Sequence, residues 1–137
     1  MSFRPINFDQ GRVLSLLLAS GTTVTKSQLL KYSSGYLVDA ATDDDEAEYI
    51  ALETVTDGTA SDGGTSVEVL PIYDGLLIVG TCSTTPVQAS HVGNSYDLTG
   101  ANTINLAAST DKLFFIHKIY DATNKLVICS VNKPAIA

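Results

Sequence analysis

Hydrophobic residues in this chain recur in short runs that are separated by turn residues. Strand-sized runs at spacings of about 8–12 residues are typical of an all-β barrel or sandwich. We therefore predict an all-β fold, a small β-barrel or β-sandwich, with helix below about 15%. The predicted strand runs are Val13–Ala19, Leu29–Tyr32, Tyr36–Ala40, Tyr49–Val55, Ser66–Ile72, Leu76–Cys82, Val87–Val92, Ala101–Leu106, Lys112–Tyr120 and Leu126–Val131.

Two segments also carry helix signals. Val13–Ala19 is one, and the other is a pattern of Thr25 and Gln28 that resembles a capping box before Leu29. Ser, Thr and Gly in every window argue against a long helix, so we expect one or two short helical turns. The segment Asp121–Asn124 predicts a hairpin between the last two runs, and the Gly-rich residues 57–65 predict an exposed loop.

The first twelve residues show no periodicity. Pro5 favours extended backbone at the residue before it, and apolar side chains in this segment would be wasted in solvent. We therefore predict an extended N-terminal arm, residues 1–12, that docks on its own domain or on a neighbour. Residues 13–137 then form a single β-rich domain. We expect the arm to be needed for partner binding and not for folding, through Phe3, Arg4, Ile6 and Phe8.

Charge is sorted along the chain. Residues 1–31 have a net charge of +3, residues 32–111 carry thirteen acids and no Lys or Arg, and residues 112–137 again have a net charge of +3. This sorting is typical of a protein that presents different surfaces to different neighbours. A total net charge of −7 argues against nucleic acid as the main ligand, because phosphate binding needs clustered Lys and Arg.

The longest apolar stretch, around Val13–Ala19, is far short of the roughly 20 residues that a membrane span requires. It also makes a poor signal peptide, because Ser15 interrupts it and no clear cleavage pattern follows. We therefore expect no membrane partner, and a protein that is made and kept in a reducing cytoplasm or released only by cell lysis.

Catalytic motifs are lacking in the sequence. The loop at residues 57–65 has no P-loop Lys, and His91 and His117 accompany no nucleophile elbow, so we expect hydrogen-bonded or interface histidines. Cys82 and Cys129 lie in apolar runs and predict two buried free thiols, with a disulfide as the alternative in an oxidising compartment. We expect no enzyme and no cofactor. A small hydrolase with a Cys–His pair is a minor alternative.

The acidic run Asp43–Glu48 contains five carboxylates in six positions. Ca²⁺ accepts oxygen ligands of this kind, but the run lacks the alternating spacing of an EF-hand loop. We therefore predict an exposed acidic loop, or one that faces a basic partner, and no metal that the fold requires.

The segment Ser20–Thr42 resembles the opening of the small head-decoration, or cement, proteins of tailed bacteriophages. In that family an arm precedes a pattern of Gly, Val, Lys and Gly, followed by hydrophobic residues and a third Gly. Ser27 departs from the pattern, which has Gly there, and this affects the geometry of the local turn. Val92–Leu98 is similar to a Gly-x-x-Tyr-Asp-Leu element of the family, and Leu126–Val131 fits its closing strand.

The resemblance implies a non-enzymatic decoration protein that clamps adjacent major capsid proteins on the exterior of the virion, commonly as a homotrimer at threefold positions. It implies synthesis in the host cytoplasm and offers no catalytic residues. The alternative from another class is a receptor- or carbohydrate-binding β-domain of a tail or fibre. That function favours exposed aromatic side chains around a pocket, and the chain contains no Trp.

The run Lys112–Tyr120 is apolar on both faces of a predicted strand, with Phe114 and Ile116 on one of them. A small barrel covers one face with its own core, so the other needs a loop, the arm or another subunit. Because threefold capsid positions favour a trimer, we predict Phe114 and Ile116 at or near the subunit contact of a homotrimer.

Overall fold

The computed structural model describes residues 3–6, 13–42, 44, 46–58, 61–73 and 75–132. Strands account for 48% and helix for 3% of the structure, so the predicted all-β fold with little helix is confirmed. The elements are β1 (Phe3–Pro5), β2 (Leu14–Leu17), β3 (Thr23–Val24), β4 (Leu29–Ser33), β5 (Tyr36–Asp39), β6 (Tyr49–Ala51), β7 (Val55–Thr56), β8 (Ser66–Pro71), β9 (Ile78–Thr81), α1 (Gln88–His91), β10 (Ser95–Thr99), β11 (Thr103–Asn105), β12 (Phe114–Asp121) and β13 (Leu126–Val131).

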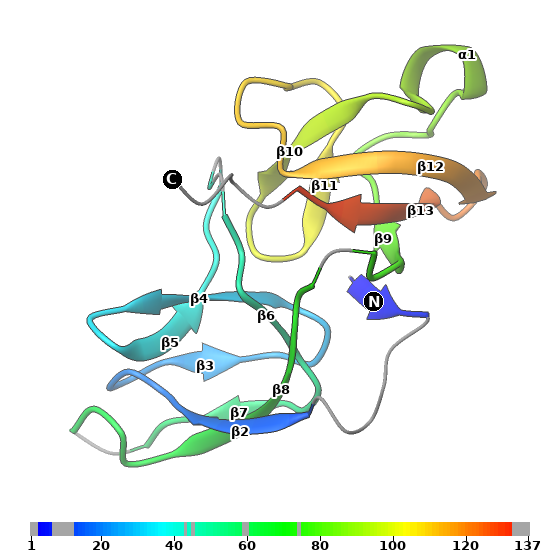
Figure 1. Ribbon diagram of the computed structural model, residues 1–137. Coiled ribbons are helices and arrows are strands. Elements are labelled where there is room, and N and C mark those ends of the chain that lie inside the picture. Colours follow the sequence, from blue (N-terminus) through cyan, green and yellow to red (C-terminus); the bar gives the residue numbers. More distant parts are fainter. Residues whose placement is uncertain are drawn as a thin grey trace.

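The strands form two lobes, with lobe A above lobe B in Figure 1. Lobe A is built on an antiparallel six-stranded sheet in the order β1-β9-β13-β12-β10-β11, and it includes α1. A bridge between Cys82 and Ile104 brings the end of β9 back to β11, so the sheet curls into a half-barrel. Lobe A thus joins residues 3–6 to residues 75–132.

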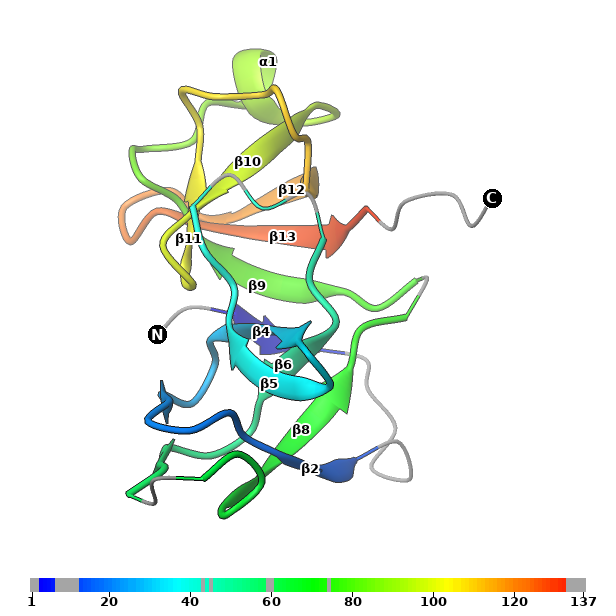
Figure 2. The same ribbon diagram turned by 90° about the vertical axis from the view of Figure 1, so that its left-hand side faces the viewer.

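Lobe B comprises residues 13–73 and is built on an antiparallel five-stranded sheet in the order β2-β8-β6-β4-β5. A parallel bridge between Leu18 and Leu37 returns the end of β2 to β5, which curls this sheet as well. The short ribbon β3-β7 completes the lobe. Figure 2 shows the lobe from the side, with β4 and β5 in front of β6 and β8.

One hydrophobic core spans both lobes. Its larger cluster combines Leu29, Ile50 and Leu70 of lobe B with Leu98 and Phe114 of lobe A. A smaller cluster, which includes Leu30, lies within lobe B. Alternate residues of a strand point to opposite faces, which is why neighbouring leucines of β4 enter different clusters. The two lobes therefore pack on one shared hydrophobic cluster.

The predicted strand at Val87–Val92 is wrong, because the segment contains helix α1. Residues 87–90 are exposed, so this part of the segment lacks the buried face that a strand of the sheet would have. Strand β10 was not predicted as a strand run. The hairpin at Asp121–Asn124 is confirmed between β12 and β13.

The capping pattern before Leu29 forms a turn and not a helix. Gln28 donates its N–H to the carbonyl of Thr25 at 3.1 Å, and its side-chain Oε1 accepts the N–H of Thr25 at 2.9 Å. Ser27 between them has a φ of 75°, a left-handed conformation that a helix does not contain. The turn therefore leads directly into β4.

The N-terminal segment is extended, as predicted, but it belongs to the sheet. Phe3, Arg4 and Pro5 pair with β9, and the N–H of Phe3 donates to the carbonyl of Ser27 at 3.1 Å. In Figures 1 and 2, β1 lies at the level where the two lobes meet. This segment is therefore a strand of the lobe A sheet, and it docks on its own domain, which is one of the two docking sites expected from the sequence.

Candidate functional site

Three of the predicted partner-binding side chains lie inside the chain's own core. Phe3, Phe114 and Ile116 are each 0% exposed. The rings of Phe3 and Phe114 stack with centroids 4.9 Å apart. The N-terminal segment thus covers the face of β12 for which a second subunit was predicted. The prediction that these side chains form a subunit contact is wrong for this structure, because none of them reaches the surface.

The other predicted residues in the N-terminal segment lie at the surface or outside the described residues. Arg4 is exposed, and its guanidinium carbon lies 5.9 Å from the centroid of the Tyr120 ring. Ile6 is also exposed. Phe8 lies outside the described residues. Arg4 and Ile6 therefore remain available to a partner.

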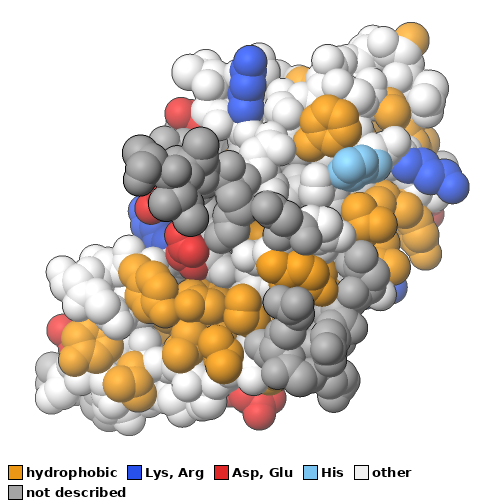
Figure 3. Space-filling model, viewed as in Figure 1, with side chains coloured by type: hydrophobic (Ala, Val, Ile, Leu, Met, Phe, Trp, Pro, Cys, Tyr) orange, Lys and Arg blue, Asp and Glu red, His pale blue; other side chains and the backbone are white. Residues whose placement is uncertain are grey.

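Aromatic rings and a cation lie on one face of lobe A. We define this outer face as Arg4, Phe115, His117 and Tyr120. Phe115 and His117 make an edge contact with centroids 4.9 Å apart, and His117 Nε2 lies 2.8 Å from Ser130 Oγ. Figure 3 shows a histidine among hydrophobic side chains on this lobe, with basic side chains nearby. Arg and aromatic side chains are enriched in protein interfaces, so this face suits a protein partner.

Lobe B presents a second apolar surface. Leu14, Leu17 and Tyr32 are among the exposed large hydrophobic side chains of the described residues, and Figure 3 shows hydrophobic side chains gathered on this lobe. The hydroxyls of Tyr32 and Tyr49 are 2.7 Å apart, and their rings meet edge to face. Burial, followed by this hydrogen bond, raises the pKa of Tyr49 to about 12.

Lobe B also carries most of the acidic residues. Residues 13–73 contain ten Asp and Glu and two Lys, whereas residues 75–132 contain three acids and three Lys. Asp39 lies opposite Leu30 in the pair of strands β4 and β5. Its Oδ1 is buried without a hydrogen-bond partner, and burial raises the pKa of this carboxyl. The apolar surface of lobe B therefore belongs to a strongly acidic half of the molecule.

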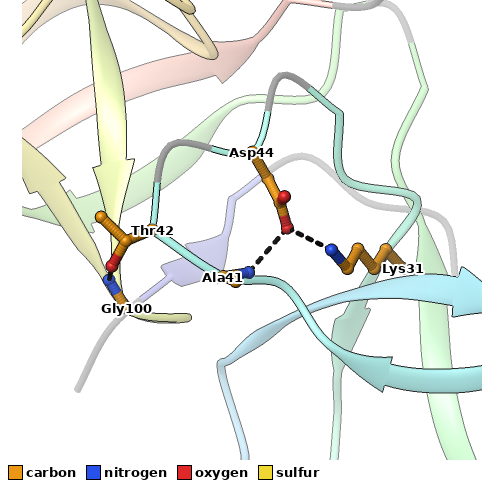
Figure 4. A network of polar contacts seen from close by, with 5 residues as sticks. All are labelled: Lys31, Ala41, Thr42, Asp44 and Gly100. Atoms are coloured by element: carbon orange, nitrogen blue, oxygen red, sulfur yellow. Dashed lines mark hydrogen bonds and ion pairs between the residues drawn. The ribbon is translucent and has the colours of Figure 1, made fainter.

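The segment that leads into the acidic run connects the two lobes through Thr42, and Asp44 fixes it within lobe B. Asp44 accepts the N–H of Ala41 at 2.7 Å and pairs with the ammonium of Lys31 at 2.9 Å (Figure 4). Thr42 Oγ1 accepts the N–H of Gly100, in lobe A, at 2.7 Å. In the described part of the chain, no three acidic, His or Cys side chains gather as a metal site would need. Asp43 and Asp45 lie outside the described residues.

The cysteines and histidines hold structural positions. Cys82 and Cys129 are buried free thiols, as predicted, and burial raises the pKa of both, that of Cys82 to about 11. A raised pKa disfavours the thiolate that a nucleophile requires. His91 Nδ1 accepts the N–H of Val87 at 2.8 Å, so both histidines are hydrogen-bonded, as predicted.

Among the described helices, none has the length and apolar character that crossing a membrane requires. Comparisons of the chain with protein-family models, with curated proteins and with solved structures find no match.

Proposed function

We propose that this protein is a non-enzymatic decoration, or cement, protein that binds the exterior of a viral capsid across the boundaries between major capsid proteins. The observation that carries the proposal is the sorting of charge between the lobes. Lobe B, with ten acids and two Lys in residues 13–73, offers an acidic surface, whereas lobe A is balanced in charge. Two surfaces of different chemistry on lobes that share one hydrophobic cluster suit simultaneous contact with two neighbours.

The proposed contacts follow from the exposed side chains. On lobe A, Arg4 and Tyr120 lie side by side at the surface. On lobe B, exposed Leu14 and Tyr32 lie within the acidic half, which suits a basic capsid surface with apolar side chains. Each contact alone can be weak, because repetition over many capsid positions and two neighbours per molecule raises the total affinity.

The geometry at Ser27 supports the resemblance to the decoration family. Ser27 stands where the family pattern has Gly, and its φ of 75° is a left-handed conformation that Gly adopts at little cost. A Gly at this position, as in the family pattern, would fit the same left-handed backbone.

A homotrimer stays a prediction that the resemblance implies. Phe114 and Ile116 do not form the contact between subunits of such a trimer, because both side chains are buried within one chain. A trimer on the capsid would instead use exposed residues such as Arg4 and Tyr120.

Co-sedimentation tests the proposal. The purified protein is mixed with capsids assembled from the major capsid protein of the same genome, and bound protein is measured after centrifugation at low and high salt. We expect binding that saturates and that delays capsid disruption on heating. We expect Glu46→Lys, at an exposed position of the acidic run in lobe B, to weaken binding, and Gln88→Lys, at an exposed position of helix α1 in lobe A, to leave it unchanged. An absence of co-sedimentation at low salt would contradict the proposal.

A further inference from the structure

A polar pocket of about 320 Å³ opens on lobe A, where the segment that enters β10 meets the loop that enters β12. Its volume is within the range of small-molecule sites. None of the described residues that line it is acidic. The lining residues are Gly93, Asn94, Ser95, Tyr96, Ser109 and Lys112.

The loop on one side of the pocket is held in place by a buried carboxylate. Asp97, which is 1% exposed, accepts backbone N–H groups from residues 110, 111 and 112 at 3.2, 2.8 and 2.9 Å. The Asn132 amide donates to the Lys112 carbonyl at 2.8 Å and to Ser95 Oγ at 3.1 Å, which ties the two sides together. The pocket is thus formed in advance of any ligand, which lowers the entropy cost of binding.

Lys112 is placed at the pocket by an unusual backbone conformation. Its φ is 53°, in the left-handed region that a lysine rarely adopts. Residues held in such conformations cluster at functional sites. The Lys112 side chain is exposed and makes no ion pair with any described acid. Its ammonium is therefore available to an anionic group that enters the pocket.

The remaining polar groups suit hydroxyls. Ser95 Oγ accepts from Asn132, which leaves the Ser95 hydroxyl hydrogen to donate. The Asn94 amide nitrogen donates to the Ser90 carbonyl at 3.0 Å, which leaves the Asn94 carbonyl oxygen as an acceptor within the described structure. The Ser109 hydroxyl both donates and accepts. One cation beside several neutral donors and acceptors complements a small molecule with one carboxylate and neighbouring hydroxyls.

We propose that this pocket binds an acidic monosaccharide unit of a surface glycan, with its carboxylate on Lys112 and its hydroxyls on Ser95, Ser109 and Asn94. A phosphate ion would occupy only a small part of a pocket of about 320 Å³. A neutral sugar would leave Lys112 unused. Lobe A, unlike lobe B, carries balanced charge and does not repel an anion. The inference does not depend on the proposed capsid role.

Nuclear magnetic resonance titration of the full chain tests the site, with glucuronic acid as the probe and glucose and inorganic phosphate as comparisons. We expect glucuronic acid to shift the amide signals of residues 93–96 and 109–112 and to bind about fivefold or more tightly than either comparison. Lys112→Gln should weaken glucuronic acid binding about fivefold or more. Lys125→Gln, also exposed and with a φ of 61°, should leave it unchanged.

Ser109→Ala gives a second test that leaves the strained backbone intact, with an expected loss of about threefold in affinity. Equal affinity for glucose and glucuronic acid would overturn the proposed role of Lys112. Phosphate binding as tight as that of glucuronic acid would show a simple anion site and overturn the saccharide. Shifts confined to other residues, or no binding at tens of millimolar, would overturn the site itself.

Discussion

Replacement of Phe3 by Ala tests whether the N-terminal segment belongs to the core. The Phe3 side chain is 0% exposed and stacks on Phe114 with ring centroids 4.9 Å apart. Its Cε1 lies 3.0 Å from the position that a Cβ on Gly80 would occupy, so the ring packs directly onto β9. Phe3→Ala removes this ring and leaves a cavity between β9 and β12.

The expected loss of stability follows from the burial of the Phe3 ring. Truncation of a fully buried Phe to Ala costs about 3–5 kcal/mol, because both the transfer free energy and the packing around the cavity are lost. With an unfolding entropy of about 2.1 cal/mol/K per residue, 1 kcal/mol shifts the Tm of a 137-residue chain by about 3.5 °C. The Tm of Phe3→Ala should therefore fall by about 10–17 °C.

Thermal unfolding followed by circular dichroism measures this shift. Ile6→Ala is the control, because Ile6 lies in the same segment but is 47% exposed. This substitution should lower the free energy of unfolding by less than about 1 kcal/mol. If Phe3→Ala, and a deletion of residues 2–11, both melt within about 2 °C of the unmodified protein, the placement of Phe3 in the core is refuted. The segment would then act only in partner binding.

Three further substitutions test the packing, charge and turn described above. Gly80→Ala should destabilise the fold by about 1–3 kcal/mol in chemical denaturation, because the new Cβ would lie 2.9 Å from Ile104 Cδ1, whereas Gly58→Ala, with no atom within 4 Å, should be nearly neutral. Because burial raises the pKa of Asp39 above 3.8, its charged form disfavours folding at neutral pH. Asp39→Asn should therefore raise the Tm at pH 7, and the gain should vanish below about pH 4; a lower Tm at pH 7 would contradict this. Ser27→Gly should raise stability in denaturant by up to about 1 kcal/mol by relieving the left-handed conformation, and a loss of stability would show that the turn is not strained.

The local pattern of hydrophobic and polar residues was sufficient to predict most strands. In Leu126–Val131 every second residue is buried, and the strand was predicted with its observed bounds. The run Val87–Val92 was predicted wrongly because Val87 is 50% exposed and only Val92, at its end, packs against the core cluster. The hydropathy of a short run does not distinguish a buried strand from an exposed turn of helix.

The candidate site was less predictable because it depends on contacts between distant parts of the chain. The alternation in β12 predicted that Phe114 needs cover, but only the fold determines that Phe3, from the other end of the chain, supplies it. The pocket beside Lys112 combines two loops of common polar residues, which carry no sequence motif. Its clearest sign is the left-handed backbone of Lys112, and a sequence does not display that conformation.

The pairing of β1 with β9 has a consequence for folding during synthesis. The smaller cluster of lobe B draws on buried residues from Leu18 to Val69, so it can form as soon as those residues leave the ribosome. Phe3 is made earlier, but Gly80 and Phe114, which it contacts, are made later. Phe3 therefore lacks these core contacts until lobe A forms around it, and pairings this distant in sequence are slow to form.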